Sequence, residues 1–497
     1  MTKRFVFLIS TCILLLFSGI CCSAVNPITI TFANGTTDFI STESGTANYV
    51  VSVNSGIPPN IPLTLSLSSI GCAQGLNATQ ITSGVSPCAG VGTLCGSSFS
   101  LTAGQRCCLS LALNSPMGGS FTLRPIVSTI PPAYSAQATS DLLINVTPIA
   151  TLSVNVSRLA LAVNCLPSST CTGVQNAALT GNPRQLVITN QSTTVAENVS
   201  YSVSPALPPG TFITPFSCGT ILSGASCILT VTPGSTPSAT PYNRSPVPVT
   251  LTVTGSNTTT VSSALNILTY GSVYQSGYVY ALYDNYLAYP INTSVGGKVV
   301  ILDSQTSPEG IRWSSDGAGG TAYNSIWGIA ENSTPASPFP NNAQSAILYP
   351  GQFNCQGNID GTCDTNNIFQ FYQNPAAFPN APVSRTLYAA GLCTLPIAGF
   401  TDWYLPAICE LGPNIQFCPA SEQNMVNNLS QLIVNSGGSN ICPFPGCFPG
   451  DHWSSTEASL FPLNSAWVQN FFPLASTQSF TGKQATLLVR CSRLLIP

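Results

Sequence analysis

Short hydrophobic runs alternate with polar residues through the first half of the chain. Apolar side chains recur largely at every second position in Ile28–Phe32, Tyr49–Val53 and Leu63–Leu67. Segments rich in Pro, Gly, Asn and Ser separate these runs. A period of two bounded by turn-forming residues is typical of antiparallel strands with one buried face. The pattern therefore predicts β-sandwich modules in this half of the chain.

A repeat indicates that there are two such modules. The pattern G-x-x-C-x-L-x-[LV] occurs at Gly104–Leu111 and again at Gly224–Val231. Each copy is followed by a closing strand-like run, at Leu142–Val146 and Ala264–Leu268. Self-similarity at this spacing predicts one module at 25–148 and another at 149–268. Both resemble the immunoglobulin-like repeats of bacterial surface proteins, a resemblance that concerns fold alone.

The second half has a different texture. All five Trp and 12 of the 16 Tyr lie beyond residue 268. Strand patterns and helical patterns are mixed there, which predicts a small α+β head over 269–497 behind the mainly β modules. The expected strands are Tyr274–Tyr283, Ser465–Phe472 and Ala485–Cys491, and the expected helices are Pro406–Leu411 and Glu422–Val434.

Charged residues are scarce. The 497 residues include 13 Lys+Arg and 16 Asp+Glu, or 6% charged, against roughly 25% in ordinary soluble domains. The net charge of −3 argues against nucleic acid as a partner, because phosphate binding needs clustered Lys and Arg. Residues 25–268 carry five basic and four acidic side chains, whereas 269–497 carry six basic and twelve acidic.

The first 24 residues have the pattern of a secretory signal peptide. Lys3 and Arg4 precede the apolar run Phe5–Phe17, and small residues at Cys22–Ala24 offer a cleavage site. Acylation at Cys21 or Cys22, as in a lipoprotein, is the second-ranked alternative. No later stretch approaches the roughly 20 apolar residues that cross a bilayer. We expect an exported protein without a transmembrane segment in the mature chain, either secreted or at the cell surface, with the periplasm left open.

The cysteines agree with an oxidising compartment. Three of the 20 fall in the signal segment, which leaves 17. The sequence has no paired C-x-x-C motifs of the kind that bind zinc. Disulfides are the better interpretation. The simplest pairings join Cys218 to Cys227, and Cys95 to one of the adjacent pair Cys107–Cys108. Because 17 is odd, at least one thiol is left over, and we expect it in the group Cys72–Cys108.

A series of motifs in the second half carries a family resemblance. In order along the chain they are Gly399–Pro406 (GFTDWYLP), Glu410-Leu411, Trp453–Glu457 (WSSTE), Ala466-Trp467 and Val489–Cys491, after an opening strand at Gly271–Tyr280. The set resembles the C-terminal domain of the Legionella collagen-like adhesin family over 269–497. The resemblance implies a C-type-lectin-like fold, similar in outline to formylglycine-generating enzymes, and a role in adhesion.

Three departures from the family pattern limit what the resemblance implies. Tyr404 stands where Arg is usual, His452 stands where an aromatic residue is usual, and the collagen-like region is absent. The acidic balance of 269–497 also argues against a sulfated polysaccharide as ligand. The resemblance leaves four aromatic candidates for ligand contact: Trp403, Tyr404, Trp453 and Trp467. Burial in the core is the alternative we favour for the tryptophans, since large aromatic side chains dominate core packing.

Further disulfides are expected in the head, although eight cysteines allow 105 pairings. A bond from Cys393 to Cys491 would tie the segment before the first predicted helix to the last strand. Local bonds are expected at Cys409–Cys418, Cys355–Cys363 and Cys442–Cys447.

The sequence contains only weak patterns for a catalytic triad, a calcium site or an oxidase site. His452 is the single histidine, and its neighbours Asp451 and Ser454 are too close along one strand to form a catalytic triad, so we expect a surface or loop histidine. Asn358, Asp360 and Asp364 are weak calcium candidates, against which we favour a disulfide-stapled turn. No cofactor is expected. An oxidase site at Cys491 lacks a second nearby Cys.

These patterns together predict a function. We expect an exported bacterial surface or secreted protein, non-catalytic, that acts as an adhesin and uses its C-terminal lectin-like domain to bind a glycan or a host protein. One alternative is a structural or pilus-associated surface protein that binds through the sandwich modules. The other is a secreted hydrolase.

Overall fold

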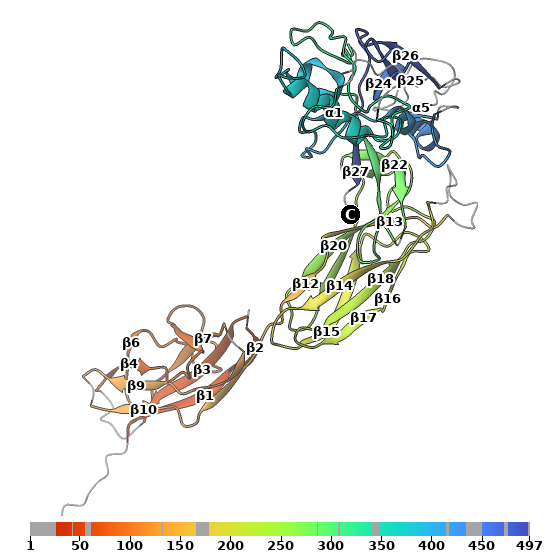
Figure 1. Ribbon diagram of the computed structural model, residues 1–497. Helices are drawn as coiled ribbons and strands as arrows, with labels where there is room; N and C mark the ends of the chain where they lie inside the picture. The colour runs from red at the N-terminus through yellow and green to blue at the C-terminus, as the bar shows by residue number, and fades with distance from the viewer. Residues whose placement is uncertain are drawn as a thin grey trace, which may run out of the picture. The chain divides into compact units, whose positions relative to one another are not determined.

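The computed structural model is mainly β (Figure 1). It describes residues 26–41, 43–54, 61–116, 118–131, 133–165, 178–285, 287–306, 309–338, 347–413, 417–433, 450–471 and 476–495. Within those ranges the chain forms 27 strands, five short helices and one 3₁₀ turn. The expected signal peptide (1–24) and the expected bond Cys442–Cys447 lie outside them. The chain divides into two compact units, Met1–Ile149 and Ala150–Pro497.

The first unit contains three sheets in its described residues. In the order in which neighbours pair, they are β1 (Ile28–Thr36), β3 (Gly45–Val53), β7 (Arg106–Asn114) and β5 (Asn77–Ile81); β10 (Ser135–Gln137), β9 (Ile126–Thr129), β4 (Leu63–Ser69) and β6 (Ser98–Leu101); and β2 (Asp38–Ile40), β11 (Leu142–Thr147) and β8 (Gly119–Leu123). All pairs are antiparallel except β2 with β11. The predicted runs Ile28–Phe32, Tyr49–Val53 and Leu63–Leu67 lie in β1, β3 and β4.

The second unit begins with two sheets that enclose a common core. One consists of β12 (Leu152–Val154), β14 (Arg184–Asn190), β18 (Ser226–Thr232) and β16 (Phe212–Thr214); the other of β13 (Arg158–Ala162), β20 (Val261–Leu268), β19 (Val249–Thr254), β15 (Ala196–Ser204) and β17 (Ser217–Ile221). Leu186 and Ile188 on β14 and Leu229 and Val231 on β18 are fully buried. Buried positions therefore alternate with partly buried ones, as the sequence pattern predicts.

The two copies of the repeat have the same local structure. The glycine that opens each copy has a positive φ, 84° at Gly104 and 69° at Gly224, and no atom lies within 4 Å of an added Cβ at either position. Backbone conformation rather than space therefore requires glycine there. Each copy then enters a strand, β7 or β18, whose first cysteine forms a disulfide bond with a cysteine that directly precedes a glycine earlier in the chain. These bonds are Cys95–Cys107 and Cys218–Cys227.

Disulfide bonds brace both units. Cys88–Cys108, which the sequence did not predict, uses the cysteine next to Cys107. The free thiol among the described residues is Cys72, in the expected group. In the second unit, Cys165 is also disulfide-bonded. The head contains three of the expected bonds: Cys355–Cys363, Cys393–Cys491 and Cys409–Cys418.

The head combines two sheets with short helices. The sheets are β21 (Val273–Tyr274), β22 (Gly277–Tyr283), β23 (Gly296–Ile301) and β27 (Ser492–Leu495), and β24 (Gly450–Glu457), β25 (Ser465–Phe471) and β26 (Thr477–Gly482). The helices are α1 (Gly361–Gln373), α2 (Ala389–Cys393), α3 (Ile408–Leu411), α4 (Met425–Asn428) and α5 (Ser430–Ile433), and η1 (Arg385–Leu387) is the 3₁₀ turn. In the described part of the chain, no helix has the length and apolarity that crossing a membrane requires.

Several head elements differ from the predicted ones. The expected strand Tyr274–Tyr283 is interrupted by a hairpin turn at Gln275 and Ser276, between β21 and β22. The expected strand Ala485–Cys491 contains only isolated bridges, because Leu487 pairs with Ile311 whereas Leu488 pairs with His452. Two successive residues thus pair with different segments, so no continuous strand forms there. Regular strand pairing begins only at β27.

The predicted helices start later than expected. Helix α3 begins at Ile408 rather than Pro406, because the Pro406 carbonyl accepts a hydrogen bond from the backbone N–H of Ser455 in an extended segment. The helix expected at Glu422–Val434 begins at Met425, where the Asn424 side chain caps it. It breaks at Leu429 into α4 and α5, and Val434 lies outside the described residues. Short polar side chains favour caps over helix interiors, which explains the late start.

A single hydrophobic core runs from the second module into the head. It includes Leu186 and Leu265 of the module together with Trp313, Trp453 and Val489 of the head. Residues 150–497 therefore form one structural unit.

Candidate functional site

The four aromatic residues expected to contact a ligand are buried. The exposed fractions are 3% for Trp403, 2% for Tyr404, 0% for Trp453 and 8% for Trp467. The expectation of an aromatic ligand platform at these positions is therefore corrected: these side chains are core. Large rings gain more by leaving water than by facing it.

Hydrogen bonds fix most of these rings in place. The indole N–H of Trp403 donates to the carbonyl of Ile397 at 2.9 Å, and that of Trp453 donates to the carbonyl of Ile311 at 2.8 Å. The Tyr404 hydroxyl donates to Glu410 Oε1 at 2.9 Å. Burying a polar group is tolerated when it is paired, so these contacts allow the aromatic motif to serve as an internal frame.

The calcium candidates are engaged in local structure. Asp360 Oδ1 accepts the backbone N–H of Cys363 at 3.0 Å and caps α1. Asp364 Oδ2 accepts the Ser455 hydroxyl at 2.9 Å inside the head, and the Asn358 amide donates to the carbonyl of Phe417. Burial raises the pKa of Asp364 well above its usual range, which disfavours the charged form that calcium needs. The three residues therefore do not fit a calcium site.

His452 is buried rather than exposed. It lies on β24 with 1% of its surface exposed, its Nδ1 lies 3.3 Å from the carbonyl of Gly450, and its ring packs edge-on against Phe471. Burial, and next the charge of Arg490, lowers its pKa to about 3. The expectation of a surface or loop histidine is wrong because the β24 register turns this side chain into the core.

The last residue of the WSSTE motif, Glu457, forms a buried ion pair with Lys483. Lys483 Nζ lies 2.6 Å from Glu457 Oε1, and neither side chain is exposed. Glu457 also accepts the backbone N–H of Ile326 at 3.1 Å, and Lys483 lies 4.4 Å from the centre of the Trp313 ring. Burial raises the pKa of Glu457 to about 7. A pair this enclosed has no access to a ligand, so we assign it a structural role.

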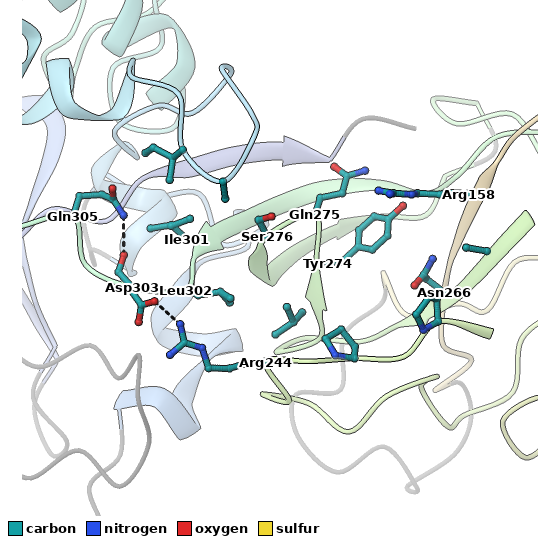
Figure 2. Close-up of a pocket in the computed structure, with 16 residues that line it drawn as sticks. Arg158, Arg244, Asn266, Tyr274, Gln275, Ser276, Ile301, Leu302, Asp303 and Gln305 are labelled. Carbon is teal, nitrogen blue, oxygen red and sulfur yellow. Dashed lines mark hydrogen bonds and ion pairs between the residues drawn. The ribbon is translucent and has the colours of Figure 1, made fainter. Parts of the chain in front are cut away.

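A cavity of about 650 Å³ lies where the second module meets the head (Figure 2). We call it the junction pocket. It is lined by side chains from β13, β20 and the β18–β19 loop of the module, and from the β21–β22 hairpin, the end of β23 and two loops of the head. Those with polar side chains are Arg158, Arg244, Asn266, Tyr274, Gln275, Ser276, Asp303 and Gln305. Its size lies within the roughly 300–1,000 Å³ of typical small-molecule sites.

Two arginines of the module reach this pocket. Arg244 forms an ion pair with Asp303 of the head. Arg158, the first residue of β13, is exposed. Beside it, Tyr274 is 8% exposed, and Figure 2 shows its hydroxyl directed toward Arg158. Burial raises the pKa of Tyr274, while its hydrogen bond to Gln275 and the charges of Arg158 and Arg493 act in the opposite direction.

The head's side of the pocket has unusual backbone geometry. Gln275, Ser276 and Ala398 have φ values of 46°, 69° and 51°, and all three line the pocket. Non-glycine residues seldom adopt positive φ, and such residues cluster at functional sites where the surrounding structure holds them.

A chain of contacts holds that backbone. Arg493 of β27 is 1% exposed, and its guanidinium donates to Gln275 Oε1 at 2.7 Å. The same guanidinium pairs with Asp402 and lies 3.8 Å from the centre of the Phe400 ring. The GFTDW motif thus positions one wall of the junction pocket.

The junction itself is fixed by buried polar contacts. The Arg184–Asp284 ion pair joins the module to the head with both side chains fully buried. The backbone N–H of Val295 donates to the carbonyl of Ala160, and the backbone N–H of Ala160 donates to Ser294 Oγ, each at 2.9 Å. The head therefore docks on the β13 edge of the module sheet, which sets the two walls of the pocket relative to each other.

The sequence interpretation missed these residues, although one signal was present. The second module contains only three basic residues, Arg158, Arg184 and Arg244, and all three lie at the junction. Two of them pair there with Asp284 and Asp303, carboxylates of the acidic head. Because charged residues are so scarce in this chain, the position of each arginine helps to locate a contact surface. The module carries more basic residues and the head more acidic ones, and this opposite charge balance predicts a contact between them.

No family model and no curated protein matches the chain. Among solved structures, the Yersinia pseudotuberculosis adhesin InvE is 12% identical, with 94% of this chain and 97% of that chain covered and a TM-score of 0.19. The D00-D0 domain of Intimin is 8% identical (48% and 99% covered, TM-score 0.21). The C-terminal domain of the Streptococcus agalactiae AgI/II polypeptide BspA is 9% identical (48% and 100% covered, TM-score 0.20). At TM-scores this low, the likeness supports no conclusion about fold or function.

Proposed function

We propose that the chain is an exported bacterial surface or secreted protein that binds a ligand in the junction pocket without changing it chemically. The observation that carries this proposal is the makeup of the pocket wall. Among the described lining residues Asp303 is the one carboxylate, and it is paired with Arg244. Hydrolysis of a glycoside by paired acids needs two free carboxyl groups facing one bond. Neutral amides and a hydroxyl, by contrast, suit reversible recognition.

An adhesin-like role fits the rest of the molecule. The disulfide bonds in both units suit an oxidising compartment outside the cytoplasm. Side-chain amides from Asn266 and Gln305, with the Ser276 hydroxyl, offer hydrogen bonds of both kinds to a ligand rich in hydroxyl groups. A glycan on a host or bacterial surface is the ligand class that these groups favour.

We also propose that 269–497 is a lectin-like domain of the collagen-like adhesin type. What supports this proposal is the part that its motif residues play. Trp403 and Trp453 lie in the core, and Asp402 holds Arg493 against the pocket wall. The motif residues therefore form the core of the head and support one wall of the pocket. We expect such structural roles if the motifs reflect a shared fold, and not if they match by chance.

The binding proposal can be tested on the complete chain, because the head shares its core with the second module. Purified protein is applied to a glycan array and to cells, next to a variant whose pocket is filled by Ala264→Phe. The matched control is Ser202→Phe, an exposed site on β15 of the same sheet outside the pocket. We expect binding that the pocket variant loses and the control keeps. Absence of binding to any array or cell surface would refute the proposal, as would equal binding by both variants.

A further inference from the structure

Among the described residues that line the junction pocket, one guanidinium has no carboxylate partner. Arg184, Arg244 and Arg493 are paired with Asp284, Asp303 and Asp402. No ion pair joins the guanidinium of Arg158 to any carboxylate in the described part of the chain, although it lies at the same junction. Among the described arginines at the junction, Arg158 is thus the one that no carboxylate of the head neutralises.

We infer that the junction pocket binds a carboxylate-bearing sugar, with its carboxylate on Arg158 and the Tyr274 hydroxyl. This inference rests on the proposed function and names the class of ligand. Figure 2 shows the Tyr274 hydroxyl and the Gln275 side chain next to Arg158. A guanidinium binds a carboxylate through two parallel hydrogen bonds, and a neighbouring phenol adds a third donor.

The charge balance of the lining selects a ligand with a single negative charge. Arg244 and Asp303 cancel each other, so Arg158 leaves one net positive charge among the described lining residues. A polymer with many sulfate or phosphate groups needs a cluster of cations, and the head offers twelve acidic against six basic residues. One carboxylate is the anion that one unpaired guanidinium neutralises.

The rest of the lining favours a sugar over a peptide. Beyond Arg158 and Tyr274, the lining includes the side chains of Asn266, Ser276 and Gln305 and the apolar surface of Pro246 and Pro248. Amides pair with ring hydroxyls, and the apolar surface suits the C–H face of a sugar ring. A peptide's terminal carboxylate is typically captured by a nest of backbone N–H groups, whereas the donors next to Arg158 are side chains.

The test uses the full chain and matched sugar pairs. Affinity is measured for oligosaccharides ending in glucuronic acid or sialic acid, and for the same oligosaccharides with that carboxyl reduced to an alcohol. Charged hydrogen bonds contribute roughly 1.5–3 kcal/mol, which predicts about ten- to hundredfold tighter binding of an acid than of its reduced form. Arg158→Gln is expected to abolish that preference, Arg158→Lys to keep part of it, and Tyr274→Phe to weaken it.

Controls separate this inference from the proposed function. Arg106→Gln, an exposed arginine of the first unit, should keep the preference, and the thermal unfolding temperature of Arg158→Gln should match the wild type because the side chain is exposed. Equal affinity for an acid and its reduced form would overturn the carboxylate inference while binding in the pocket stands. Binding of a peptide C-terminus in place of the sugars, dependent on Arg158, would overturn the choice of a sugar. Loss of acid preference in Arg106→Gln as well would overturn the assignment to Arg158.

Discussion

The single histidine makes a sharp prediction about stability in acid. His452 is buried on β24, where burial lowers its pKa from 6.5 to about 3. The folded protein therefore resists protonating this ring, whereas the unfolded chain accepts a proton below about pH 6.5. The stability that comes from the neutral ring is fully present above pH 6.5 and is lost as the pH falls from 6.5 toward 3.

The size of this effect follows from the shift. Each pH unit below the unfolded pKa costs about 1.4 kcal/mol of unfolding free energy for one such group. At pH 4.5 the expected loss is therefore about 3 kcal/mol, and over the whole window it is about 5 kcal/mol. Total stabilities of ordinary domains are only about 5–15 kcal/mol, so the loss is large enough to measure.

The assay compares denaturant unfolding of the wild type with His452→Gln and His452→Phe between about pH 8 and pH 4. Both variants remove the titrating group, and the phenylalanine also keeps a ring against Phe471. Carboxylates titrate in the same range, but they are common to all three proteins and cancel in the difference. Any cost of the substitution at pH 8 is subtracted as a constant. The wild type should then lose about 1.4 kcal/mol per pH unit more than either variant.

A parallel pH dependence in the three proteins would refute the reasoning, because it would mean that His452 titrates alike in the folded and unfolded states. A wild type that gains stability relative to the variants as the pH falls would reverse the sign and point to a protonated, paired imidazole instead. Both outcomes are distinguishable from failure to fold, since each variant is measured at pH 8 first.

Three other substitutions test the junction and the frame of the head. Asp284→Asn leaves Arg184 buried without its counter-charge and should lower the free energy of unfolding by about 3–5 kcal/mol, measured by denaturant unfolding of the full chain. Trp453→Ala should lower it by about 3–5 kcal/mol through the cavity that it leaves, seen as a drop in the unfolding temperature. Replacing both Cys393 and Cys491 by Ser opens a loop of 98 residues and should cost about 4–5 kcal/mol under non-reducing conditions.

Each of these has a comparison on the same chain. Asp303→Asn breaks an exposed pair and should cost about 1 kcal/mol or less; a cost equal to that of Asp284→Asn would contradict the role of burial. Loss of ligand binding in Trp453→Ala at unchanged stability would mean that this tryptophan contacts the ligand after all. The bond Cys218–Cys227 closes only 9 residues, so its removal should cost about 2 kcal/mol less than that of Cys393–Cys491.

Local chemistry determined a large part of this structure. The two-residue period of apolar side chains in runs such as Tyr49–Val53 placed strands correctly, because alternate side chains of a strand face opposite sides. The repeated glycine and cysteine pattern marked equivalent turns and strands, and the pairing of Cys218 with Cys227 lay within reach of neighbouring strands. These features depend on residues close together in sequence or repeated along it.

The tertiary structure decided the rest, because the deciding contacts join distant segments. Trp453 faces the core, where its indole N–H donates to the carbonyl of Ile311. Ile311 is far from Trp453 in sequence, so no local pattern predicts this contact. His452 became a buried base through the register of β24, not through its neighbours in the chain. The junction pocket unites Arg158, Tyr274 and Ala398, which no local period relates. The sequence pattern predicts which apolar side chains are buried. Only the packing of the module against the head determines which polar groups still face the solvent.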